Sequence, residues 1–526
     1  MSDLSQEELA RTIAILESLV ENRIQLASIP QEQRVALLTA AGRLSRPHRH
    51  ETVKLSKAFR RIQRKANRAA DRDARDATEI RAARRADVFS APPRLPPGAS
   101  STPPRELNTP RNCYVCKAEF TRLHFFYDSM CEACAELNYE KRHQTAVLDG
   151  RVALITGARV KIGYQAALKM LRAGARVIVT TRFPHDAAKR YASEPDYAKF
   201  ADRLQIHGLD LRHCPSVELF ARYLEQTCPR LDFLVNNAAQ TVRRPANYYA
   251  HLLEHEIRAH HDLAPEMRKL LRGHEACKSA MSVSVSNVAR SESRSSGPGV
   301  LTMLGQQGTV SGGLAIWNDG APGVGIRSSA LLSQMPCTYE DGITSTELFP
   351  TGAMDADLQQ VDLRATNSWR ATLAEVLTAE LLEVNLINAV APFILCSKLK
   401  PLMMREPTGD RHIVNVTAME GIFSRHTKTD KHPHTNMAKA ALNMMTLTSA
   451  PDYAKGGIFM NAVDTGWVTD EDPAHISQRK QEMHDFQPPL DIVDGAARIC
   501  DPFFSDLNTG VRVYGKFLKD YRPAPW

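Results

Sequence analysis

The chain has 526 residues, of which 43% are hydrophobic, 24% charged and 6% aromatic, so it has the composition of a globular protein with two or more domains. No uninterrupted apolar run reaches the ~18–20 residues that a membrane span requires, and the first residues lack the basic and apolar regions of a secretory signal. These features argue against an integral membrane protein and indicate a soluble, cytoplasmic one. The net charge of +8 is concentrated in residues 51–85, which hold 12 Lys or Arg and five Asp or Glu.

Residues 1–89 are predicted to form a helical, basic N-terminal region. Ser5 and Glu8 have the spacing of a capping box, and apolar residues follow at helical spacing. Two short helices of this kind bury little apolar surface by themselves, so we expect them to dock onto another surface, such as a second copy in a homo-oligomer. The alanine-rich segment 51–85 is predicted to be a charged helix that is either solvated or binds an acidic partner or nucleic acid.

The next two segments are a linker and a cysteine module. Residues 90–111 contain seven prolines and are predicted to be an extended linker. Residues 112–143 hold two Cys-x-x-Cys pairs separated by 14 residues, a spacing typical of a structural zinc site. A redox dithiol needs only one such pair, so the paired arrangement favours zinc. The predicted metal ligands are Cys113, Cys116, Cys131 and Cys134.

From residue 147 to residue 526, strand patterns alternate with helix patterns. Short apolar runs predict strands at 151–156, 176–181, 204–208, 231–236, 411–415, 458–463 and 510–514. Helical periodicity predicts helices at 162–173, 216–228, 377–404 and 436–454. Repeated strand–helix units predict an α/β fold, in which a doubly wound parallel sheet carries helices on both faces.

A large insertion at about 243–361 interrupts this alternation. Within it, residues 279–336 are rich in Ser and Gly and lack sustained periodicity, so they are predicted to be flexible. The segments 247–271 and 362–369 have more regular patterns, and we expect them to cover the mouth of the active site. Because the insertion would shape the pocket, the sequence indicates a small-molecule substrate without identifying it.

A glycine-rich turn follows the first strand of the alternation, from Thr156-Gly157 to Gly163, and such turns let backbone amides approach a pyrophosphate. Downstream lie Asp210-Leu211, Asn236-Asn237-Ala238-Ala239, Asn385 in a long helix, Lys439 in HTNMAKAAL, and Gly466-Trp467. In these motifs and their order, residues 147–526 resemble the short-chain dehydrogenase/reductase superfamily. The resemblance implies a Rossmann fold and an NAD(P)-dependent oxidoreductase that reduces a carbonyl or oxidises an alcohol.

The resemblance also implies which residues bind the cofactor. They are Thr156, Gly157, Arg159, Lys161, Ile162, Gly163, Arg182, Asp210, Leu211, Asn237, Ala238 and Lys439. A site for NAD normally has a carboxylate at the end of the second strand, whereas this strand ends with Thr180, Thr181 and Arg182. Arg182, with Arg159 or Lys161, is placed to bind a 2′-phosphate, so the sequence favours NADP(H) over NAD(H).

The catalytic residues depart from the family's pattern of asparagine, serine, tyrosine and lysine. Asn385 and Lys439 are present, but Thr435 stands at the tyrosine position and Ala418 at the serine position. An aliphatic hydroxyl does not ionise near neutral pH, so Thr435 is not equivalent to a catalytic phenol.

Two hypotheses follow from these replacements. In the first, the proton relay is rebuilt from His434, beside Thr435, and from Thr417, which precedes the lost serine. For His434 the alternative to this role is an exposed surface histidine. In the second hypothesis, the chain is a catalytically inactive NAD(P)-binding regulatory or scaffold protein. The retained lysine fits both, and the oxidoreductase is the favoured interpretation.

Overall fold

The structure is a computed structural model that describes residues 5–95, 105–292, 323–338, 341, 347–406, 408–425 and 427–526. The chain divides into two compact units, Met1–Arg72 and Asp73–Trp526. The first unit is helical, and the second contains the cysteine module and the sheet.

The N-terminal unit consists of α1 (Gln6–Glu21), a 3-10 helix (Arg23–Ser28), α2 (Gln31–Ser45) and most of α3 (Arg49–Asp76). The predicted capping box is present, because the Glu8 amide donates to Ser5 Oγ and the Ser5 amide donates to Glu8 Oε2. Neither α1 nor α2 contains a buried residue. The apolar side chains of these two helices are therefore exposed or only half-buried within the part of the chain that the structure describes.

The second unit is built on an eight-stranded sheet in the order β10-β9-β8-β7-β6-β3-β4-β5. The strands are β3 (Val152–Thr156), β4 (Arg176–Thr181), β5 (Leu204–Gly208), β6 (Phe233–Asn236), β7 (Arg411–Thr417), β8 (Ile458–Asp464), β9 (Phe517–Lys519) and β10 (Arg522–Ala524). Neighbouring strands are parallel except for β9 and β10. The predicted doubly wound α/β fold is confirmed.

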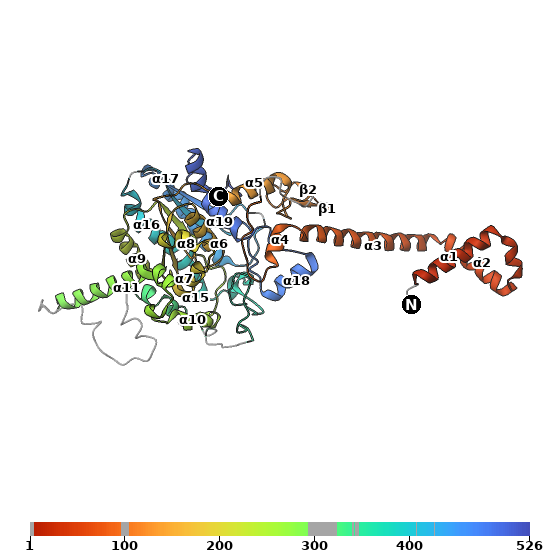
Figure 1. Ribbon diagram of the computed structural model, residues 1–526, viewed down its shortest axis with the longest axis horizontal. Coiled ribbons are helices and arrows are strands. Elements are labelled where there is room, and N and C mark those ends of the chain that lie inside the picture. The colour runs from red at the N-terminus through yellow and green to blue at the C-terminus, as the bar shows by residue number, and fades with distance from the viewer. Residues whose placement is uncertain are drawn as a thin grey trace. The chain divides into compact units, whose positions relative to one another are not determined.

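Helices cover both faces of this sheet (Figure 1). Along β3, Ala153 and Ile155 pack into one core with α6 (Lys161–Arg172) and α19 (Ile492–Thr509). Leu154 points to the opposite core, which contains α9 (Cys214–Thr227) and α16 (Ala391–Met404). Every residue of β3 is consequently buried, which explains its continuous apolar sequence.

The other α-helices of the described residues connect or flank these layers. They are α4 (Glu79–Arg84), α5 (Glu132–His143), α7 (Pro184–Ala192), α8 (Tyr197–Phe200), α10 (Ala250–Glu256), α11 (Pro265–Glu292), α13 (Val324–Arg327), α14 (Ser329–Leu332), α15 (Thr378–Asn385), α17 (Pro433–Lys455) and α18 (Ala474–His484). From β3 the chain proceeds to β4 on one side, whereas β6 leads to β7 on the other. Ligands of doubly wound sheets bind at such a reversal, beyond the carboxyl ends of the strands.

Three predicted segments are corrected by the structure. The final strands are β9 and β10 instead of 510–514, because α19 continues to Thr509 and Gly510 ends it at φ +72°. The end of the predicted linker 90–111 belongs to β1 (Glu106–Asn112), which pairs with β2 (Glu119–Arg122). Within 279–336, α13 is ordered and buried, while the prediction for 293–322 lies outside the described residues.

One continuous helical stretch, Thr378–Met404, is long and apolar enough to cross a membrane by length and composition. Polar residues are spread along this stretch, so it contains no uninterrupted apolar run of that length. Of its 18 consecutive most apolar residues, 56% are buried inside the fold. Leu395 and Leu399 belong to the core on one face of the sheet. This stretch is therefore packed as a core helix.

Candidate cofactor site and metal site

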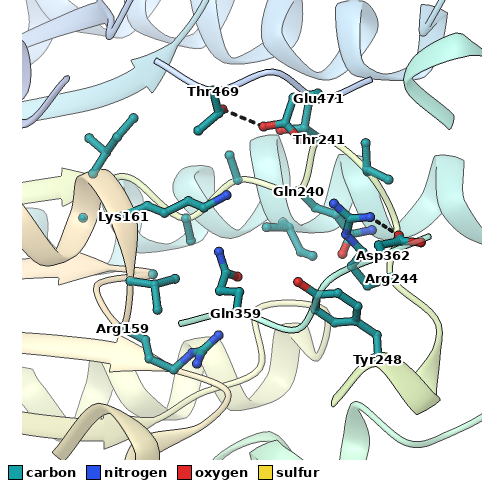
Figure 2. A pocket seen from close by; sticks show the side chains of 18 of the residues that line it. Arg159, Lys161, Gln240, Thr241, Arg244, Tyr248, Gln359, Asp362, Thr469 and Glu471 are labelled. Atoms are coloured by element: carbon teal, nitrogen blue, oxygen red, sulfur yellow. Dashed lines mark hydrogen bonds and ion pairs between the residues drawn. The ribbon is translucent and has the colours of Figure 1, made fainter. Parts of the chain in front are cut away.

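A cavity of about 650 Å³ lies at the carboxyl ends of β3, β4, β6, β7 and β8 (Figure 2). Most of the residues predicted to bind the cofactor line it, although they come from separate strands. The predicted residues in the lining are Gly157, Arg159, Lys161, Ile162, Gly163, Arg182, Asp210, Leu211, Asn237, Ala238, Thr417 and Lys439. Thr156 supports the cavity from behind, because its Oγ1 accepts a 3.0 Å hydrogen bond from the Ala238 amide.

The glycine-rich turn has two positions where a side chain would not fit. Gly157 has φ +67°, and a Cβ on it would lie 2.7 Å from the Cα of Ala238. A Cβ on Gly163 would lie 2.3 Å from Nδ2 of Asn237, which donates to the carbonyls of Thr156 and Gly157 at 3.0 and 3.1 Å. Asn237 thus fixes the turn at the start of α6, where backbone amides are available to a phosphate.

Lys161 occupies the place of the family's middle glycine, and its backbone keeps a glycine-like conformation with φ +56°. A left-handed backbone at a non-glycine residue is uncommon and often marks a functional site. Figure 2 shows the Lys161 side chain extended into the cavity. Among the described residues its ammonium group forms no salt bridge, although its charge opposes the burial that raises the pKa of Asp357.

The two arginines predicted to read a 2′-phosphate differ in their partners. Arg159 is engaged in an ion pair with Asp186 at 2.6 Å. Arg182, at the end of β4, donates to the Tyr249 hydroxyl at 2.8 Å, and its guanidinium lies 4.7 Å from the centre of the Tyr249 ring. Within the described ranges Arg182 has no carboxylate partner. Arg182 is therefore held in place by an aromatic side chain, and its positive charge, with that of Arg212, lowers the pKa of the buried Asp210 against the effect of burial.

Asp210 lies at the adenine side of the cavity that the resemblance implies. Its carboxylate is buried and pairs with Arg212 at 2.6 Å, and Arg212 also pairs with Glu383. Although burial opposes ionisation, the Arg212 guanidinium lowers the pKa of Asp210. The Asp210 amide donates to the carbonyl of Gly325 in α13, so the insertion packs directly against this part of the site.

The insertion forms one wall of the cavity. Tyr248 and Gln359 point into it, and Arg244 pairs with Asp362 on the same side (Figure 2). The segments expected to cover the mouth thus contribute lining residues, including Tyr248 and Asn367. Gln359, the loop residues 469–473 and the first turn of α18 also line the cavity, but no motif in the sequence marks them.

Lys439 lies at the end of the cavity formed by β7 and α17, together with Thr417 and Ala418. Its Nζ donates to the carbonyl of Val416 at 2.9 Å, and burial lowers the pKa of its ammonium group to about 8. Thr417 Oγ1 is buried and has no hydrogen-bond partner among the described residues. This end of the cavity therefore holds a titratable cation beside an available hydroxyl group.

The structure does not bring His434, Thr435 or Asn385 into the cavity lining. His434 is only 1% exposed, so the interpretation of a surface histidine is wrong. Burial lowers the pKa of His434 to about 4, and Glu380 Oε1 lies 3.8 Å from its Nε2. A neutral histidine outside the lining is poorly placed for proton transfer, so the rebuilt relay through His434 has no geometric support.

Asn385 is turned away from the cavity, since its Nδ2 donates to the carbonyl of Leu381 in its own helix. It immediately precedes a π-helical segment, Leu386–Val390. In that segment Asn388 exchanges two hydrogen bonds, of 2.8 and 3.0 Å, with the backbone of the lining residue Gln240. π-helical turns are often found at functional sites, and here the turn presents an asparagine three residues later than the motif predicts.

The four predicted zinc ligands come together in the cysteine module. The sulfur atoms of Cys113, Cys116, Cys131 and Cys134 all lie within 4.8 Å of one another, and the Cys116 and Cys131 sulfurs are 3.6 Å apart. A tetrahedral zinc with bonds of ~2.3 Å separates its sulfur ligands by roughly 3.8 Å. All four cysteines are free of disulfide bonds. The geometry therefore fits a closed four-thiolate metal site.

The electrostatics of this cluster also suit a metal. A backbone hydrogen bond from Ala118, with contacts from neighbouring cysteines, lowers the pKa of Cys116 to about 7. Burial raises the pKa of the Cys134 thiol. A divalent cation would stabilise all four groups as thiolates, including Cys134, whose thiol stays protonated most readily without a metal.

Two families match the chain in sequence order. The family described as "short chain dehydrogenase" matches residues 151–258, and "Enoyl-(Acyl carrier protein) reductase" matches residues 363–491. The matches lie on either side of the insertion and include the glycine-rich turn and Lys439, respectively.

Individual relatives cover the chain to different extents. "Uncharacterized protein R665" of Acanthamoeba polyphaga mimivirus is 28% identical over 426 residues, which cover 78% of this chain and 74% of that protein. Retinol dehydrogenase 14 of Mus musculus is 38% identical over 101 residues. D-beta-hydroxybutyrate dehydrogenase of Cupriavidus necator is 35% identical over 92 residues. These two matches each cover 18% of this chain, and 30% and 34% of the respective dehydrogenases.

Solved structures include the Pseudomonas aeruginosa RhlG/NADP active-site complex, with a TM-score of 0.39 and 15% identity over 71% of this chain and 95% of that one. The NADPH-bound carbonyl reductase from chicken fatty liver has a TM-score of 0.39 and 14% identity over 72% and 100% of the two chains. Together, the two family matches, the sheet order and the glycine-rich turn identify the chain as a distant member of the short-chain dehydrogenase/reductase superfamily, a family of NAD(P)-dependent oxidoreductases.

Proposed function

We propose that the protein is an NADP(H)-dependent oxidoreductase that interconverts a carbonyl and an alcohol, with Lys439 exchanging the proton. The observation that carries the proposal is the position of the buried Lys439 ammonium group in the lining of the cavity. It lies beside Thr417 and Ala418, where the family's catalytic groups would be found.

The cofactor would extend along the carboxyl edge of the sheet. The amides at the start of α6 and the Lys161 ammonium group would hold the pyrophosphate. Arg182, which forms no salt bridge within the part of the chain that the structure describes, would pair with the 2′-phosphate through charge-assisted hydrogen bonds. The nicotinamide end would then reach Lys439 across the cavity.

A bound NADPH supplies a hydride to the carbonyl carbon. In this direction the Lys439 ammonium group donates a proton to the carbonyl oxygen, and the products are the alcohol and NADP⁺. A pKa of about 8 is close to neutrality, where general acids work best. The Thr417 hydroxyl, which has no hydrogen-bond partner among the described residues, would donate a hydrogen bond to the same oxygen. It would thereby replace the hydroxyl of the family's serine, whose position is occupied by Ala418.

The cofactor preference is tested by Arg182→Asp. This change should weaken NADPH binding by about 1.5–3 kcal/mol, the scale of a hydrogen bond to a charged group, and spare NADH. Isothermal titration calorimetry with both cofactors measures the difference. Arg176→Asp is the matched control, because Arg176 is exposed at the other end of β4. Equal weakening for both cofactors would show that Arg182 does not read the 2′-phosphate.

The alternative function is an NAD(P)-binding regulatory or scaffold protein without turnover. It is favoured by one specific observation, the replacement of the catalytic tyrosine by Thr435, whose buried hydroxyl lies outside the cavity lining. NADPH oxidation with a panel of aldehydes and ketones separates the two functions. Binding without oxidation of NADPH by any carbonyl in the panel would support the alternative.

A further inference from the structure

We infer that the cysteine module is coupled to the cofactor cavity through Tyr114, which positions the loop of residues 465–473. Through this coupling the metal site would influence the affinity for the cofactor, in addition to stabilising the fold of the cysteine module. The inference rests on the proposed cofactor site, because the loop forms part of the lining of that cavity.

Tyr114 is fixed by the metal-binding turn. It lies between the predicted ligands Cys113 and Cys116 in the first Cys-x-x-Cys pair. The Cys113 amide donates to the carbonyl of Ala118, and the Tyr114 amide donates to the carbonyl of Ser129, both at 2.8 Å. Ser129 lies close to the second pair, so the Tyr114 backbone is held between the two halves of the metal site.

The side chain of Tyr114 leaves the module and reaches the loop after β8. Its hydroxyl oxygen accepts a 2.9 Å hydrogen bond from the Trp467 amide. Gly466 precedes this contact with φ +76°, and a Cβ on it would lie 2.5 Å from Leu490 and 3.2 Å from the Tyr114 hydroxyl. The loop backbone is thus packed tightly against Tyr114, and its path depends on where that side chain lies.

The same loop continues into the cavity. Thr465, Thr469 and Asp472 of the loop are among the residues that line it. Between them, Val468 is buried in a core shared with Leu123, Phe126 and other side chains of the module. A displacement of Tyr114 would therefore also displace the residues of the cavity wall on both sides of Trp467.

The module has a second, separate attachment to the sheet domain. Arg142 of α5 is fully buried and pairs with Asp491 at 2.6 Å and Asp494 at 3.0 Å. Tyr127 donates to Asp494 at 2.6 Å. Because these contacts do not involve Tyr114, removal of its hydroxyl should leave the module in place. Positioning of the loop is thereby separable from docking of the module.

The first test is Tyr114→Phe in the full zinc-loaded chain. We expect zinc content to be unchanged, NADPH affinity to fall by about 2–10-fold, the worth of one hydrogen bond, and amide hydrogen exchange in residues 465–473 to accelerate. Tyr139→Phe is the matched control, since the Tyr139 hydroxyl also accepts a backbone hydrogen bond within the same unit, but from Leu95, at 3.0 Å, instead of from the loop. Unchanged exchange in the loop of Tyr114→Phe would overturn the inference.

The second test uses the reciprocity of coupled binding, in which each ligand changes the affinity of the other by the same factor. NADPH should raise the equilibrium affinity of the parent protein for zinc, measured by competition with a chelator, by about 2–10-fold, and this effect should be lost in Tyr114→Phe. If NADPH binds but the zinc affinity is the same with and without it, the coupling is wrong and the cofactor site stands. If NADPH does not bind, the cofactor proposal fails, and hydrogen exchange in the loop decides whether Tyr114 positions it.

Discussion

Lys439→Arg should lower kcat for carbonyl reduction by about 10²–10⁴, the usual contribution of a general acid, while NADPH still binds. Arginine keeps the positive charge at this position but does not release its proton at the pH of the reaction. Lys439→Met should lose turnover and also weaken NADPH binding, because it removes the charge from the cavity. Steady-state kinetics and calorimetry on the two variants separate proton transfer from cofactor binding.

The role of Lys439 as proton donor also predicts how the rate of turnover depends on pH. Because the pKa of Lys439 is about 8, carbonyl reduction should be fast below pH 8 and decline as the ammonium group loses its proton above it. Alcohol oxidation needs the neutral amine and should show the opposite dependence. Lys455→Arg serves as the control, since Lys455 is exposed at the end of the same helix, α17. An unchanged kcat and pH profile in Lys439→Arg would exclude Lys439 as the proton donor.

Loss of one zinc ligand should unfold the cysteine module. Four-thiolate sites hold about one zinc per chain, and the metal contributes on the order of 10 kcal/mol to local folding. Cys116→Ser is the informative change, because Cys116 is exposed and its replacement costs little packing. We expect zinc content to fall in metal analysis and proteases to cleave within residues 112–143, while the sheet domain resists them.

Cys337→Ser is the control for this experiment, since Cys337 is also exposed and free but lies in the insertion. It should retain zinc and resist proteolysis like the parent protein. A zinc-free Cys116→Ser variant with an intact, protease-resistant module would contradict a structural role for the metal.

The parts of this protein that were predictable from sequence are those set by local chemistry. Each buried parallel strand is a short apolar run, as β3 shows, and Gly157 and Gly163 are required by contacts within a few ångströms. The cysteine spacing also predicts the geometry of the metal site, because the two cysteines of each pair lie in one turn of the chain. In such cases neighbouring residues in the chain determine the structure.

Features that depend on tertiary contacts were not predictable in the same way. His434 lies among polar residues in the sequence, yet α17 places it against Glu380 in the interior, where it is 1% exposed. Asn385 fits the motif, but the π-helical segment after it presents Asn388 to the cavity wall instead. Gln359 carries no motif, and only the fold of the insertion brings it into the site.

The most direct test of the account is a calorimetric titration of the zinc-loaded parent protein with NADPH and with NADH. The cavity, the glycine-rich turn and the position of Arg182 at the end of β4 predict that about one NADPH binds per chain, ~10–150-fold more tightly than NADH, the factor that corresponds to a hydrogen bond to a charged group. Absence of binding for both cofactors, or equal affinity for the two, would contradict the NADP(H) site on which the proposed function depends.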